Sequence, residues 1–277
     1  MHRLPAARLL PACVLCTAAL LTATACTPGS GDASASAAAA TGPAGSVTPG
    51  ATATLTAAQA QAALLTEADL GAPWAPTQGA ATWRDGVLKA RTTVPGCQRL
   101  LDALYSDQPL GAPTGTYAVT GFDDGDDSAQ LRYQVLSQRP ADVDRALAWL
   151  RTLPEACSRF TATTTRSGEQ DVRVTALDLP DVGDARQGLR ITFTSQSNTG
   201  GDSYDSYDSD EWDEGDERNT EPTTTLTLEV AAVRVGSEAI ALTEGAPGAL
   251  PPNVTAHAVQ SGTQRLTDVR RSARAQA

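Results

Sequence analysis

Two runs of alternating apolar and polar residues, 115–122 and 129–137, flank a short acidic turn at 123–127. In the second run Leu131, Tyr133 and Val135 fall on one face of an extended strand. The pattern predicts a β-hairpin with a polar connection. It is a strong constraint on the fold, because the apolar face of such a hairpin must be buried against other elements.

The rest of the chain reads as further strands and helices. Strands are expected at 158–165, 170–177, 188–195, 223–235 and 238–243, with one more between 82 and 93; helices are expected at 56–65, 66–71, 97–104, 140–153 and 253–271. Long strands grouped between helices predict the α+β class. We expect a single domain over residues 55–277, with an antiparallel sheet whose helices pack on one face and with one disulfide.

Five cysteines divide into three groups. Cys13 and Cys16 lie in the N-terminal segment, Cys26 directly follows it, and Cys97 and Cys157 lie in the expected domain. An even pair in an exported protein predicts a disulfide between Cys97 and Cys157. Two free thiols are the alternative; a metal site is disfavoured, because two distant cysteines supply too few ligands.

The N-terminus has the layout of a secretory signal peptide over residues 1–25. A basic start at His2, Arg3 and Arg8 is followed by an apolar stretch and by the small residues 23–25. The stretch is too short for a membrane span. Cys26 in the next position resembles the acylated cysteine of bacterial lipoproteins, although Ala23 stands where such signals usually have Leu. An ordinary secretory signal with an incidental Cys26 is the alternative.

After Cys26, residues 27–54 consist largely of Ala, Ser, Gly, Thr and Pro. Such a segment buries too little apolar surface to offset its ordering entropy, so residues 26–54 are predicted to form a disordered tether. The expected location is therefore the extracellular face of the cell membrane, with the lipid on Cys26 as the anchor.

The net charge is −11, and removal of residues 1–25 makes it more negative, since Arg3 and Arg8 are lost with no acid. This balance argues against nucleic acid as a partner. Much of the excess lies in 198–222, which we expect to be a disordered acidic loop. Calcium binding or a basic partner are alternatives, but EF-hand spacing from Asp208 fails, because Trp212 and Asn219 occupy ligand positions.

Few residues carry a recognisable chemistry. Beyond the signal segment His257 is the single histidine, and we interpret it as a surface or packing residue of the last helix rather than a catalytic base. Arg132, Arg190 and Arg234 lie on expected strands and either line an anion pocket or face solvent. No phosphate loop, zinc spacing or nucleotide fingerprint occurs, so no catalytic residue, metal or cofactor is expected.

Several short motifs together resemble a known family. They are Leu64–Leu65–Thr66–Glu67–Ala68–Asp69–Leu70–Gly71 with Trp74, then Cys97 with Leu101, Cys157, Val233–Arg234–Val235–Gly236, and Arg265–Leu266. This order is similar to that of actinobacterial lipoproteins with a PknH-like extracellular sensor domain. The resemblance implies an antiparallel sheet with helices on one side and a cleft for a ligand. It implies no catalytic residue, and this chain can form one disulfide where the family often has two.

The leading functional hypothesis is a membrane-anchored, non-catalytic ligand-binding or sensor-like domain. The ligand is left open among a small molecule, a lipid and a cell-wall fragment, and the oligomeric state is also left open. An exported hydrolase that uses carboxylates, and a structural lipoprotein that docks a partner, are the alternatives.

Overall fold

The computed structural model describes residues 54–81, 83–126, 128–196 and 223–276. The predicted signal peptide, Cys26, the tether up to residue 53 and the acidic loop 198–222 lie outside these residues, so they stay predictions.

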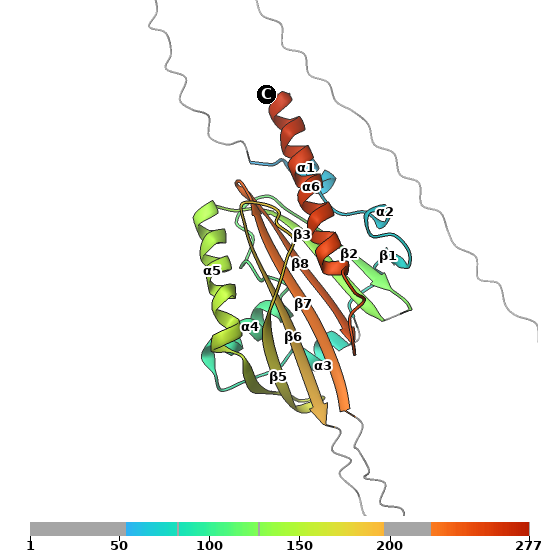
Figure 1. Ribbon diagram of the computed structural model, residues 1–277, viewed down its shortest axis with the longest axis vertical. Helices are drawn as coiled ribbons and strands as arrows, with labels where there is room; N and C mark the ends of the chain where they lie inside the picture. The colour runs from blue at the N-terminus through green and yellow to red at the C-terminus, as the bar shows by residue number, and fades with distance from the viewer. Residues whose placement is uncertain (1–53, 82, 127, 197–222, 277) are drawn as a thin grey trace, which may run out of the picture. The chain divides into compact units, whose positions relative to one another are not determined.

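Eight antiparallel strands form one sheet in the order β1-β2-β3-β8-β7-β6-β5-β4 (Figure 1). The strands are β1 (Trp74–Pro76), β2 (Tyr117–Asp124), β3 (Ala129–Ser137), β4 (Arg159–Thr164), β5 (Gly168–Leu177), β6 (Ala185–Gln196), β7 (Thr223–Val235) and β8 (Glu238–Pro247). The predicted hairpin is confirmed as β2 and β3, with Thr120 opposite Tyr133. The later strands also match their predictions, although β8 is longer than expected.

In the described part of the chain six helices accompany the sheet: α1 (Ala57–Ala62), α2 (Glu67–Leu70), α3 (Trp83–Val87), α4 (Pro95–Tyr105), α5 (Pro140–Ala156) and α6 (Val254–Ala275). Thr56 caps α1 as expected, with its side chain and that of Gln59 forming a capping box. The strand expected between 82 and 93 is wrong. That segment forms α3 and then a single bridge from Arg91 to Thr163 on the edge strand β4.

The α+β class and the antiparallel sheet are confirmed, but the helices pack on both faces rather than on one. Two separate cores lie on opposite sides of the sheet, one under α4 and α5 and the other under α1 and α6. Strand β7 explains why: Leu228 and Val230 enter the first core, whereas Ala231 and Val233 enter the second. A strand that is apolar on both sides needs cover on both sides.

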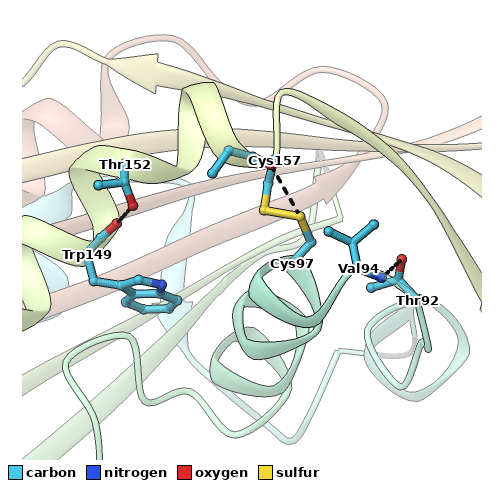
Figure 2. Close-up of a disulfide and its surroundings, with 7 residues drawn as sticks. Thr92, Val94, Cys97, Trp149, Thr152 and Cys157 are labelled. Atoms are coloured by element: carbon cyan, nitrogen blue, oxygen red, sulfur yellow. Dashed lines mark hydrogen bonds between the residues drawn. A yellow bond between two sulfur atoms is a disulfide. The ribbon is translucent and has the colours of Figure 1, made fainter.

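Disulfide Cys97–Cys157 joins the two helices of the first core. Cys97 lies in the first turn of α4 and Cys157 ends α5, with an S–S distance of 2.04 Å and a Cα–Cα distance of 5.7 Å. Figure 2 shows Trp149 on α5, about two turns before Cys157. Its ring lies 4.0 Å from the Arg99 guanidinium carbon, a cation–π contact between the same two helices.

On the opposite face α6 approaches the sheet closely at Gly262. A Cβ at this position would lie 2.5 Å from the Tyr133 hydroxyl oxygen, so only glycine fits over that ring. Tyr133 is wholly buried beneath the helix. The contact places the first half of α6 over β8 and β3 and, with them, over the charged groups described below.

Candidate functional site

A small polar pocket of about 180 Å³ lies beside β2 and β3, on the α4 side of the sheet. Its charged and polar walls come from four separate segments: Thr77 after β1, Arg84 on α3, Asp107 after α4, and Gln130 and Arg132 on β3. Strand alternation places Arg132 on the side of β3 opposite Leu131 and Tyr133. The pocket is therefore assembled only when the helices of this face dock on the sheet.

Asp107 is the carboxylate at the centre of the pocket wall. It follows α4 with a φ of 54°, a left-handed conformation that aspartate tolerates better than most residues. Its backbone carbonyl accepts a hydrogen bond of 2.7 Å from the Gln134 side-chain amide. The residue is only 7% exposed, so its charge needs a partner.

Two arginines compensate the Asp107 charge. Both terminal nitrogens of Arg84 lie 2.8 Å from its carboxylate oxygens, and Arg84 also donates to the Tyr105 carbonyl. Arg132 approaches with Nε at 3.1 Å, but this buried N–H makes no hydrogen bond within the described residues. The Arg132 side chain is 43% exposed. Arg84 is thus held by Asp107 and by the Tyr105 carbonyl, whereas Arg132 makes a single ion pair in the described part of the chain and keeps the more exposed side chain.

The opposite wall is a fixed hydrogen-bond network around Asp123. Gln130 donates to Asp123 at 2.8 Å, the Thr77 hydroxyl donates at 2.8 Å, and the Gln78 backbone N–H donates at 3.0 Å. Burial raises the pKa of Asp123, but these hydrogen bonds outweigh it and leave the pKa below its ordinary value. This wall is rigid and ionised, and its donors are already used.

A second polar cluster lies under α6, where Glu244 on β8 faces Glu229 on β7. The two residues are direct partners in the ladder, and Glu229 in turn pairs with Arg190 on β6. Arg190 Nε donates to Glu229 at 3.0 Å. Glu244 is wholly buried, and the Thr255 hydroxyl donates a hydrogen bond of 2.6 Å to it.

The environment of Glu244 disfavours its charge. Burial raises its pKa to about 7, with further increases from the Glu229 and Asp124 charges, and the hydrogen bonds from Thr255 offset only part of the effect. One oxygen, Oε1, has no hydrogen-bond partner within the described residues. A buried carboxyl with these properties marks a site whose protonation matters.

The sequence candidates are not brought together. Arg234 pairs with Asp144 on α5 at 2.7 Å, Arg190 pairs with Glu229 on the other face, and Arg132 lies in the pocket, so the three arginines do not form one anion site. His257 is exposed, and its Nε2 lies 2.7 Å from the Asp69 carbonyl, to which it donates. That nitrogen is thereby engaged in packing α6 against α2.

The sequence reasoning missed Arg84, Asp107 and Glu244. Arg84 and Asp107 are ordinary surface-type residues in sequence, and nothing nearby indicates that they meet Arg132. Glu244 carried a usable signal, because it interrupts a run of apolar residues in a strand that is otherwise buried on both sides.

Within residues 54–276, leaving out the undescribed positions, no group of three or more His, Cys, Asp or Glu side chains is arranged to hold a metal ion. In the same part of the chain no helix combines the length and apolarity needed to span a membrane.

The comparisons with known proteins found a likeness among the solved structures. No known family profile matches the chain, and no curated protein matches it. The chain is similar to the crystal structure of the extracellular domain of PknH from Mycobacterium tuberculosis, with a TM-score of 0.43 and 15% sequence identity, over 80% of this chain and 100% of that one. The expected resemblance is thus found in the structure, and no residue or ligand is carried over from it.

Proposed function

We propose that this chain is an exported, lipid-anchored, non-catalytic domain that binds a small anionic ligand, with a carboxylate as the recognised group, in the pocket between Arg84, Asp107 and Arg132. The observation that carries the proposal is Arg132: its Nε lies 3.1 Å from Asp107 without a hydrogen bond within the described residues, and its side chain is 43% exposed. A planar guanidinium fork matches a carboxylate.

The pocket volume limits the ligand. At about 180 Å³ it lies well below the roughly 300–1,000 Å³ of sites for drug-sized molecules, so the ligand or its bound part is small. Arg84 and Asp107 neutralise each other. A bound anion would therefore meet the remaining positive charge of Arg132, held in position by Asp107.

The hydrolase alternative finds less support. The one carboxylate in the pocket wall near the arginines, Asp107, is held by both of them, so its oxygens face cations of the protein rather than a substrate. The paired carboxyls Glu229 and Glu244 lie under α6 rather than in the pocket. Acid and base groups are therefore not placed together around space for a substrate.

Binding is tested by calorimetry on the purified domain with acetate, lactate and succinate, and with inorganic phosphate as a different anion. We expect saturable binding of at least one carboxylate, weakened about tenfold or more in Arg132→Gln, since a charged hydrogen bond is worth about 1.5–3 kcal/mol. Arg173→Gln is the matched control, because Arg173 lies on the open face of β5. Equal affinity of Arg132→Gln and the wild type would refute carboxylate binding in this pocket.

The anchor is supported by the signal-like N-terminus, by Cys26 and by a disulfide of the kind that persists in oxidising compartments. Fractionation of cells that express the full chain tests it. Cys26→Ala should move the folded domain out of the membrane fraction. Retention of this variant in the membrane fraction would show that the lipid is not the anchor.

A further inference from the structure

A free backbone N–H group at the N-terminus of α6 finds its hydrogen-bond acceptor outside the helix. Asn253 precedes the helix in a left-handed conformation, with φ of 64°, and its side chain makes no capping hydrogen bond. Glu244 from β8 takes that role: it accepts hydrogen bonds from both the backbone N–H and the hydroxyl of Thr255. A residue of the neighbouring strand thus caps the helix, so the cap forms only when α6 is docked.

The charges around this cap are mostly of one sign. Glu229 faces Glu244 from β7, and Asp124 acts on it from β2. Arg190 on β6 is the nearby cation, but it pairs with Glu229 and is 53% exposed. From α6 itself Thr255 contributes only neutral donors, and His257 is turned toward the Asp69 carbonyl of α2.

We propose that Glu244, faced by Glu229, forms a proton-operated latch for α6, in which a proton on Glu244 keeps the first turn of the helix closed on the sheet and its loss loosens that turn. The proposal goes beyond ligand binding and rests on a different face of the sheet. Three observations carry it: the two acids are direct partners in the ladder, Oε1 of buried Glu244 has no hydrogen-bond partner among the residues that the structure describes, and the helix cap depends on that same carboxyl.

The direction follows from linkage. Burial and the neighbouring acids raise the pKa of Glu244 to about 7 in the closed form, whereas an opened form would return it toward its ordinary value of 4.5. The closed form therefore binds the proton more tightly, and its advantage shrinks as the pH rises from about 4.5 through about 7. Opening of the first turn becomes about tenfold more favourable between about pH 6 and about pH 8.

Hydrogen–deuterium exchange on the whole chain tests the latch. Protection of the amides at the start of α6, corrected for intrinsic exchange, should fall about tenfold between about pH 6 and about pH 8. The first turn of α5, on the other face, is the internal control and should show no such fall. Glu244→Gln should abolish the change, because the amide keeps the shape and loses the proton equilibrium.

Glu229→Gln provides a second variant that does not alter the cap itself. Removing the facing negative charge lowers the Glu244 pKa, so the loss of protection should shift to lower pH and shrink between the two test conditions. The same pH-dependent loss in the wild type and in Glu244→Gln would overturn the proposal. So would constant protection in the wild type. Either result would leave ligand binding at Arg132 unaffected.

Discussion

The two faces of the sheet solve the problem of buried charge in opposite ways. On the α4–α5 face, Asp107 is neutralised by Arg84 and Arg132, and a disulfide ties the covering helices together. On the α6 face, Glu244 has an acid opposite it and no covalent link holds the helix within the described residues. The first face is built to stay fixed, whereas the second depends on a proton. A fixed wall suits a binding pocket, and a proton-dependent helix suits a response.

The largest expected effect is removal of the covalent link. The double variant Cys97→Ser, Cys157→Ser opens a loop with a sequence separation of 60 residues. Its free energy of unfolding should fall by about 4 kcal/mol in the chain-entropy model. Denaturant unfolding measures the loss, and the wild type under reducing conditions is the control. A loss below about 1 kcal/mol would mean that packing alone fixes this face.

Glu244→Gln should raise stability, but only at neutral and alkaline pH. Because the folded pKa of about 7 exceeds the ordinary value of 4.5, ionisation costs stability as the pH rises through this window. The variant should gain up to about 3 kcal/mol near pH 8 and little near pH 4.5. Urea unfolding across the pH range gives the two curves. If the free energy of unfolding varied with pH in the same way in the wild type and the variant, Glu244 would not make the α6 face pH-dependent.

Asp107→Asn, on the α4–α5 face, should lower the free energy of unfolding, whereas Glu244→Gln on the α6 face should raise it. The amide fits the same space and tolerates the left-handed backbone, but it leaves the Arg84 guanidinium, which is 19% exposed, without a counter-ion. We expect a loss of about 2 kcal/mol at neutral pH, less than for a fully buried pair because water reaches Arg84. Asp102→Asn on the exposed surface of α4 is the matched control. An equal loss of stability in this variant would mean that the pairing of Asp107 with the arginines contributes nothing specific.

Arg190→Gln should have the smallest effect. Its half-exposed side chain pairs with Glu229 in water-accessible surroundings, so stability should change by less than about 1 kcal/mol. The variant is informative through its pH profile. Loss of the Arg190 cation leaves two acids facing each other, so the pKa of Glu244 should rise. Titration of the carboxyl groups followed by nuclear magnetic resonance measures this shift. An unchanged midpoint for Glu244 would mean that the Arg190 charge does not affect its protonation.

The framework of the fold could be predicted because its signals are local. Alternation between apolar and polar residues predicted β2 and β3, and an even pair of cysteines in an expected exported protein predicted the disulfide, with free thiols as the alternative. The second helix layer was also present in the sequence, since β7 carries Leu228, Val230, Ala231 and Val233 without alternation between apolar and polar residues. Such a strand is buried on both sides, so it requires a covering layer on each face of the sheet.

The sites could not be predicted because each depends on contacts between distant segments. Arg84, Asp107 and Arg132 belong to α3, the segment after α4 and β3, and no spacing rule relates them. Glu229 and Glu244 meet through a strand register that the turn at Gly236 sets. A shift of one residue would send one of the acids to the opposite face and remove the pair.

Strands β6 and β7 remain paired as far as Gln196 and Thr223, so the chain leaves the sheet and returns to it at adjacent points. The entropy of closing such a loop grows only slowly with its length. The fold therefore places almost no limit on what is carried between these two residues. A peptide epitope or a fluorescent reporter inserted here would begin and end at neighbouring points on the sheet. The position between Gln196 and Thr223 therefore suits the insertion of a label.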